Sequence, residues 1–299
     1  MFNIQTPTHS DIRYGNFSER QKLDIYIPSS HEGPFPLIIN IHGGAFMMGS
    51  KDSHENDCAS FETLLENGYA IASVGYRLSG EKIFPACASD CKGAIRWLKA
   101  NSDSYNLDPE RFIVWGRSAG GHLAALMALT QNDPSIFDDP SIFDVKTDSS
   151  IYAAVDWYGP SDFSRMDEQF REITPEACVN GVQNHDSPDS PESKLLGGPV
   201  QEKLELNQLA NPVSYAASAS FVPPFFFGVG DSDCLVPHQQ TLILHEAVKA
   251  RGSSTELHVL KGVGHAGSIF EEVLTPKVIA WLKQLENEQE GKWVNQWQK

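Results

Sequence analysis

Short apolar runs alternate along the chain with segments whose apolar residues recur at helical spacing. The run at 37–42 is continuous, which is typical of a strand covered on both faces. Strands are predicted at residues 12–14, 22–27, 37–42, 69–74, 111–115, 151–158, 225–229 and 256–260. Helices are predicted at residues 61–67, 90–101, 118–130, 238–250 and 268–285. The alternation predicts an α/β fold with a mostly parallel central sheet and helices on both faces.

The regular pattern breaks down between the sixth and seventh predicted core strands. Residues 159–224 are rich in Pro, Asp, Ser and Gly, with short helical hints only at 167–173 and 204–209. Their aromatic and leucine residues can still pack, and long excursions in compact domains are usually functional. We therefore predict a single domain over residues 1–299, with 159–224 as an insertion rather than a linker.

Charge and hydropathy narrow the class of partner. The 299 residues carry 23 Lys and Arg against 39 Asp and Glu, a formal net charge of −16. Nucleic acid and anionic membrane surfaces are bound by clusters of basic residues, so neither partner is expected. No run approaches 18 apolar residues, and no basic segment followed by an apolar one opens the chain, so a cytoplasmic location is expected.

The cysteines are few, odd in number and scattered along the chain. This distribution favours reduced thiols over a disulfide framework. The spacing of Cys87 and Cys91, without a second pair, is a poor zinc signal, and no metal site is predicted. The five positions are Cys58, Cys87, Cys91, Cys178 and Cys234.

One stretch carries a chemical signature. An apolar run ends at Gly116, and an Ala- and Leu-rich helical segment begins at Ser118, with Gly120 following. This Gly-x-Ser-x-Gly pattern between a strand and a helix is typical of a nucleophile elbow. Glycines at both positions keep side chains away from the turn, and the helix start directs free N–H groups at a reacting oxygen. A helix-capping serine in a tight turn is the alternative interpretation.

A serine nucleophile needs a base and an orienting carboxylate, in the chain order Ser, Asp, His for this architecture. His265 lies in a glycine-rich loop after a predicted strand, where small neighbours let an imidazole reach the serine. Asp231 and Asp233 compete for the carboxylate role. Asp231 could serve the turn itself, because aspartate readily bonds its own backbone. We therefore predict Asp233 as the triad carboxylate.

Donors for an oxyanion are predicted at two places. Gly43 and Gly44 follow the buried strand at 37–42, so their N–H groups can face a substrate, and Ala119 adds the N–H after the serine. Phe46 is a candidate wall of the acyl pocket, although an aromatic residue after a turn is more often core. No metal or organic cofactor is required for this chemistry.

These motifs resemble the esterase and lipase branch of the α/β-hydrolases, and most of all the bacterial-type carbohydrate esterases related to feruloyl and acetyl esterases. The resemblance spans roughly residues 20 to 285. Its motifs are HGGAF (42–46), VGYRL (74–78), AIRWL (94–98), WGRSAGGHLA (115–124), DWYGPSDF (156–163), SPESKLLGG (190–198), NPVSY (211–215), GDSDCLVP (230–237) and GH (264–265).

The resemblance implies an α/β-hydrolase fold, a triad of Ser118, Asp233 and His265, and an insertion that shapes the substrate pocket. Trp157 and Tyr158 are further pocket candidates. We expect hydrolysis of short-chain acyl esters, or of feruloyl or acetyl esters of carbohydrates, with a small-molecule or oligosaccharide ester as substrate. An arylformamidase-type amidase and a non-catalytic ligand-binding homologue are the alternatives, and a homodimer is possible.

Two positions depart from the family pattern. Relatives often carry a third glycine where Ala45 stands, and many lipase-like relatives have an acidic residue where Arg117 stands. Neither change removes a reacting group. For Arg117 we expect an ion pair on the protein surface, with a preference for anionic or polar substrates as the alternative.

Overall fold

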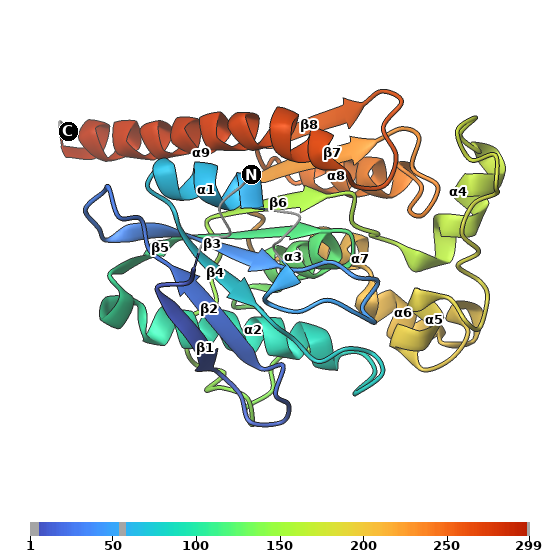
Figure 1. The fold of residues 1–299 in the computed structure, drawn as a ribbon, viewed down its shortest axis with the longest axis horizontal. Helices are drawn as coiled ribbons and strands as arrows, with labels where there is room; N and C mark the ends of the chain where they lie inside the picture. Colours follow the sequence, from blue (N-terminus) through green and yellow to red (C-terminus); the bar gives the residue numbers. More distant parts are fainter. Residues whose placement is uncertain (1–5, 54–57, 298–299) are drawn as a thin grey trace.

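The computed structural model describes residues 6–53 and 58–297 and is built around one eight-stranded sheet (Figure 1). The strand order is β1-β2-β4-β3-β5-β6-β7-β8, and pairing is antiparallel only where β2 meets β1 and β4. The predicted mostly parallel sheet is therefore confirmed. The strands are β1 His9–Arg13, β2 Lys22–Tyr26, β3 Phe35–Ile41, β4 Ala70–Val74, β5 Leu107–Arg117, β6 Ala153–Trp157, β7 Phe225–Gly230 and β8 Thr255–Leu260.

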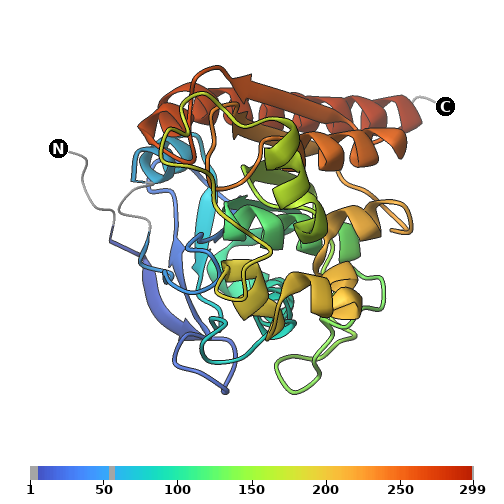
Figure 2. The same cartoon turned by 90° about the vertical axis from the view of Figure 1, so that its right-hand side faces the viewer.

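Helices cover both faces of this sheet (Figures 1 and 2). Side chains of successive strand residues point to opposite faces, so Phe225 and Phe227 pack in one apolar cluster while Phe226 packs in the other. The first cluster is completed by α2 (Ala86–Ala100), α3 (Ala119–Thr130) and α8 (Gln239–Ala250). The second cluster is completed by α1 (Cys58–Glu66) and α9 (Ser268–Trp297).

The predicted elements are all present, and the largest difference in length is at the C-terminal helix. We expected this helix to end near residue 285, whereas α9 continues to Trp297. The segment after Leu285 lacks an apolar stripe, which is why periodicity could not extend the prediction. It is nevertheless rich in Glu, Gln and Lys, which have a high intrinsic helix propensity. Among the described residues, no helix is long and apolar enough to cross a membrane.

The insertion between β6 and β7 folds into short helices. Figure 1 shows α4, α5 and α6 beyond the carboxyl ends of the parallel strands. Phe163, Met166 and Leu195 are buried in the same apolar cluster as the sheet, so the segment packs on the body of the protein. Its elements are η3 Phe163–Arg165, α4 Met166–Glu172, α5 Pro191–Leu196, η4 Val200–Glu202, α6 Leu204–Ala210 and α7 Pro212–Ala216.

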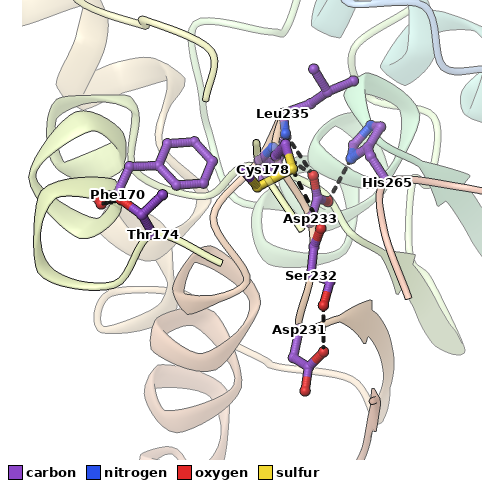
Figure 3. Close-up of a disulfide and its surroundings, with 10 residues drawn as sticks. Phe170, Thr174, Cys178, Asp231, Ser232, Asp233, Leu235 and His265 are labelled. Carbon is purple, nitrogen blue, oxygen red and sulfur yellow. Dashed lines mark hydrogen bonds and ion pairs between the residues drawn. A yellow bond between two sulfur atoms is a disulfide. The ribbon is translucent and has the colours of Figure 1, made fainter. Parts of the chain in front are cut away.

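The expectation of reduced thiols is wrong for two of the cysteines. Cys178, in the insertion, forms a disulfide with Cys234, which follows β7 (Figure 3). The partners lie 56 residues apart in sequence, and only the return of the insertion over the β7 loop brings their Cα atoms to 5.6 Å. Cys87 and Cys91 are free and buried, and the side chain of Cys58 lies outside the described residues. The disulfide removes one of the arguments for a cytoplasmic location, which stays a prediction.

Candidate active site

Ser118 occupies a strained turn between β5 and α3. Its backbone angles are φ 54° and ψ −123°, a region that a residue with a side chain adopts at a cost of about 1–3 kcal/mol. The turn is held by the N–H of Ser118, which donates to the carbonyl of Trp157 at 2.9 Å. The hydroxyl is thereby presented at the end of the strand and at the start of the helix.

The flanking glycines are required by close backbone contacts. A Cβ atom on Gly116 would lie 2.0 Å from the carbonyl oxygen of Gly120. A Cβ atom on Gly120 would lie 2.0 Å from the carbonyl oxygen of Ile41, on the neighbouring strand β3. Both distances are far below van der Waals contact, so the tight packing of helix against strand at this turn admits only glycine.

The structure brings Ser118, His265 and Asp233 together. The Ser118 hydroxyl lies 2.9 Å from Nε2 of His265, and Nδ1 of the same ring lies 2.6 Å from Oδ2 of Asp233. Because an ionised carboxylate only accepts hydrogen bonds, Nδ1 carries the proton and Nε2 is left as the acceptor that faces the hydroxyl. This arrangement can withdraw a proton from Ser118 as its oxygen attacks a carbonyl.

The two aspartates of the β7 loop have different surroundings (Figure 3). Asp233 is buried, and its Oδ1 accepts hydrogen bonds from the N–H groups of Leu235 and Val236 at 2.8 and 2.9 Å. Asp231 instead accepts from the N–H of Gly262 at 2.6 Å and from the hydroxyl of Ser232. Asp231 therefore ties the β7 and β8 loops together, and only Asp233 contacts the histidine.

The candidate oxyanion donors lie close to Ser118. Ala119 is the first residue of α3, so its N–H has no carbonyl acceptor within the helix. Gly43 and Gly44 line a cavity together with Ser118. The loop turns through consecutive positive φ values of 113° at Gly44, 55° at Ala45 and 60° at Phe46. This conformation explains why glycine is favoured where Ala45 stands.

A cavity of about 580 Å³ opens over Ser118. Two of the three predicted pocket residues, Phe46 and Tyr158, line it, and the Tyr158 ring packs edge-on against the His265 ring with centroids 4.8 Å apart. The other lining residues are Gly43, Gly44, Ala45, Met48, Gly49, Ser53, Arg117, Ser118, Ala119, Pro160, Gln183, His185, Pro191, Glu192, Leu235, Val236, His265 and Ala266.

The prediction for Trp157 is wrong, because its side chain does not line this cavity. Trp157 is the last residue of β6, and its ring is buried against Trp115 and Phe270, in the apolar cluster that α1 and α9 complete. Tyr158 adopts a positive φ of 46° just after the strand ends and turns toward His265. Trp157 supports the elbow through its carbonyl, which accepts the N–H of Ser118.

Arg117 forms an ion pair, but the pair is buried rather than at the surface. Its guanidinium lies 2.8 Å from the carboxylate of Glu271 and stacks over the Trp157 ring at 4.8 Å. It also donates to the side chain of Asn40 at 3.2 Å. A buried arginine needs such partners, and Glu271 from the first turn of α9 supplies the countercharge. Arg117 thus links the elbow strand to α9.

Asp156 is a buried titratable group that the sequence did not single out. Its Oδ1 accepts the N–H of Gly159 at 3.0 Å, and its Oδ2 has no hydrogen-bond partner among the described residues. Burial raises the pKa of this carboxyl to about 7. It lies next to Gly121 of α3, where a Cβ atom would be 2.2 Å from Oδ1. The only sequence signal was a carboxylate inside an otherwise apolar strand.

Elsewhere, the described residues form a second cavity but no cluster of side chains suited to a metal ion. A second cavity, of about 750 Å³, is lined by Glu110 in the first half of β5 and by residues that directly precede strands, such as Tyr152, Pro224 and Ser254, so it lies at the amino edge of the sheet, away from Ser118. Among residues 6–53 and 58–297, no group of three or more His, Cys, Asp or Glu side chains is placed to hold a metal ion.

An elbow serine at the carboxyl edge of a mostly parallel sheet, followed by aspartate and histidine on later loops, defines the class of the α/β-hydrolases. Solved structures agree. A carbohydrate esterase from gut microbiota, in truncated form, is 26% identical with a TM-score of 0.80, over 93% of this chain and 95% of that one. A bifunctional GH43-CE protein of Bacteroides eggerthii is 30% identical with a TM-score of 0.76, over 92% of this chain and 38% of that one. The predicted α/β-hydrolase fold is confirmed.

The sequence comparisons define the family. The BD-FAE family model matches residues 23–248, and the chain belongs to this family. A curated relative, the probable carboxylic ester hydrolase LipM of Mycobacterium tuberculosis, is 31% identical over 232 residues, which are 77% of this chain and 49% of that protein. The chain spans about half the length of the first curated relatives it matches. The resemblance to α/β-hydrolase esterases is therefore confirmed.

Proposed function

We propose that this protein hydrolyses carboxylic esters through an acyl-enzyme, and that its substrates are short-chain acyl esters or feruloyl and acetyl esters of carbohydrates. The observation that carries the proposal is the 2.9 Å contact between the Ser118 hydroxyl and Nε2 of His265 at the floor of a 580 Å³ cavity. The names of the relatives, among them a carbohydrate esterase and a carboxylic ester hydrolase, support it.

The first half of the reaction forms the acyl-enzyme. The Ser118 oxygen attacks the ester carbonyl carbon while Nε2 of His265 accepts the hydroxyl proton. The carbonyl oxygen becomes an anion that the N–H groups of Gly43, Gly44 and Ala119 stabilise. Collapse of this intermediate breaks the bond to the alcohol oxygen, which leaves with the proton from His265, and the acyl group stays on Ser118.

The second half releases the acid. A water molecule gives a proton to Nε2 of His265 and attacks the acyl carbon. The serine then leaves and recovers that proton. Asp233 acts in both halves, because it keeps the proton on Nδ1 and stabilises the imidazolium that forms twice per turnover. Its own hydrogen bonds from Leu235 and Val236 fix the direction of the carboxylate.

The lining of the cavity combines apolar and polar side chains. Phe46, Tyr158 and Val236 supply apolar surface beside Ser118, while Gln183, His185 and Glu192 supply polar groups from the insertion. A cavity that combines an apolar part with a few convergent polar groups is typical of small-molecule sites. This mixed lining suits an ester that joins an apolar acid to a hydroxylated alcohol.

The proposal is tested with p-nitrophenyl acetate, methyl ferulate and an acetylated xylo-oligosaccharide, each given to the wild type and to Ser118→Ala. We expect the wild type to turn over the activated ester, and the variant to lose about 10³-fold or more in kcat because the nucleophile is absent. Circular dichroism provides the control that the variant is folded. Activity above a few percent in folded Ser118→Ala, or silence of the folded wild type on every ester, would refute the proposal.

A further inference from the structure

Part of the cavity wall is polar and comes from the insertion. Gln183, His185 and Glu192 line the cavity together with Ser118 and His265. None of these three side chains has a part in the proposed reaction. Glu192 is 3% exposed, and it lies in the first turn of the short helix α5. A carboxylate so deeply buried beside a substrate cavity calls for a physical account.

Glu192 is held by an ion pair with His185. Nδ1 of His185 lies 2.8 Å from Oε2 of Glu192, and Nε2 lies 2.9 Å from the carbonyl oxygen of Leu235. A carbonyl oxygen only accepts hydrogen bonds, so Nε2 carries a proton, and a second proton lies between Nδ1 and the carboxylate. Although burial alone would lower the pKa of His185, the hydrogen bond and charge of Glu192 raise it above its ordinary value. The hydrogen bonds at both ring nitrogens fit an imidazolium that faces a carboxylate.

The other carboxylate oxygen is available to a ligand. Within the described part of the chain, Oε1 of Glu192 accepts no hydrogen bond, and the side chain lines the cavity. An ionised carboxylate can only accept hydrogen bonds, so a ligand binds this oxygen by donating an O–H or N–H group to it. An apolar group in the same place would leave a buried charge without a second partner, which is unfavourable.

The pair is fixed in position before any substrate arrives. The N–H of His185 donates to Asp167 at 2.8 Å, and the hydroxyl of Ser190 donates to the His185 carbonyl at 2.8 Å. The same Ser190 oxygen accepts the N–H of Ser193 and so caps α5, the helix that carries Glu192. Rigid support of this kind is what a group needs to discriminate between substrates.

A disulfide and two hydrogen bonds fix the His185–Glu192 pair relative to the loop that carries Asp233. The disulfide between Cys178 and Cys234 joins the insertion to the residue that follows Asp233. The N–H of Gln183 donates to the Cys234 carbonyl at 3.0 Å, and His185 reaches the Leu235 carbonyl on the same loop. The free oxygen of Glu192 is thus held at a set position in the cavity that contains the proposed triad.

We infer that Glu192 is a specificity-determining residue, which accepts a hydrogen bond from a substrate hydroxyl group and so selects hydroxylated esters over apolar ones. This inference rests on the proposed function. The hydroxyl can come from a sugar on the alcohol side of the ester or from the phenol of an aromatic acyl group. Both sources offer the same donor to the same oxygen, and matched substrates distinguish them.

The test uses two pairs of esters that differ only in hydroxyl groups. A methyl xylopyranoside monoacetate is compared with its di-O-methyl ether, and methyl ferulate is compared with methyl 3,4-dimethoxycinnamate, so that the free hydroxyl groups of the first member are methyl ethers in the second. In Glu192→Gln we expect kcat/KM for the hydroxylated member of at least one pair to fall by about 10–100-fold, mainly through KM. The other member, and p-nitrophenyl acetate, should change less than about threefold. The pair that responds identifies the source of the hydroxyl.

Glu202→Gln is the matched control, because Glu202 is an exposed acid of the same insertion. It should leave all rates unchanged. Equal losses on both members of each pair, or no loss on any, would overturn the role of Glu192. If Glu192→Gln does not fold, measurements on the wild type still test the inference. The inference requires the wild type to have a higher kcat/KM for the hydroxylated member of at least one pair. Failure of the folded wild type on every ester would refute the proposed function itself, which is a different result.

Discussion

The carboxyl edge of the sheet and the insertion build one cavity, but they hold their residues by different means. At the sheet edge, Ser118 is fixed by a strained backbone and by glycines that touch neighbouring strands. In the insertion, His185 and Glu192 are fixed by side-chain hydrogen bonds and by a disulfide. The close backbone contacts at the sheet edge leave no room for an added side chain. In the insertion, by contrast, a single substitution removes one hydrogen bond or the disulfide and leaves the other contacts in place. The proposed reaction chemistry and the proposed substrate selection therefore fall on separate parts of the molecule.

The largest effect should come from the carboxylate of the proposed triad. In Asp233→Asn the amide favours the wrong tautomer of His265, and kcat on p-nitrophenyl acetate should fall by about 10⁴-fold, or roughly 5.5 kcal/mol. Asp231→Asn is the matched control, because it keeps an acceptor for Gly262 and does not contact His265. Losses of similar size in the two folded variants would remove the distinction between the aspartates.

The elbow should be the least tolerant point of the backbone. In Gly120→Ala the new Cβ meets the Ile41 carbonyl, and the free energy of unfolding in urea should fall by more than about 3 kcal/mol. Gly80→Ala is the control, since a Cβ atom at Gly80 has open space around it, and its effect should stay within about 0.5 kcal/mol. Equal stability of the two variants would show that the elbow is less constrained than its contacts indicate.

The disulfide should act on the insertion without acting on the reaction. Cys178→Ser should lower the free energy of unfolding by about 2–4 kcal/mol, because the closed loop spans 56 residues. Dithiothreitol should destabilise the wild type by a similar amount and leave the variant unchanged. Turnover of p-nitrophenyl acetate should change less than about threefold, since Leu235 and Val236 still orient Asp233. A wild type whose unfolding is insensitive to reductant would contradict this assignment.

The smallest effect concerns Asp156, beneath the elbow. Its pKa is raised to about 7 in the folded protein, above the value of about 3.9 in an unfolded chain. The native state therefore binds more protons between these values, and stability falls as pH rises through this window. Between pH 5 and 7.5, wild type should lose about 2 kcal/mol relative to Asp156→Asn. Parallel pH profiles of the two proteins in urea unfolding would exclude this linkage.

Local patterns predicted the sheet edge well, because its determinants are neighbours in sequence. The elbow, the oxyanion loop and the loops of Asp233 and His265 each follow a strand directly, and strand ends converge in a parallel sheet. The error at Trp157 also has a local cause. Whether the last strand residue faces the core or the cavity depends on where the backbone turns, and the positive φ at Tyr158 sets that turn.

The insertion could not be predicted to the same depth. Its period is irregular, so nothing in the sequence indicated that Cys178 would return to Cys234 or that His185 would meet Glu192. Both contacts depend on a loop path that short helices and side-chain hydrogen bonds determine together. The buried pair of Arg117 and Glu271 was missed in the same way, since its partner lies 154 residues downstream.

The central claim is that Ser118 is a nucleophile activated by His265. The most direct measurement is peptide mass mapping after reaction with a p-nitrophenyl alkylphosphonate, which transfers its phosphonyl group to an activated serine. We predict one adduct per chain, on Ser118, with labelling slowed by about 10³-fold or more in His265→Ala. A folded protein that remains unlabelled, or one that is labelled at another residue while Ser118 stays free, would contradict the account.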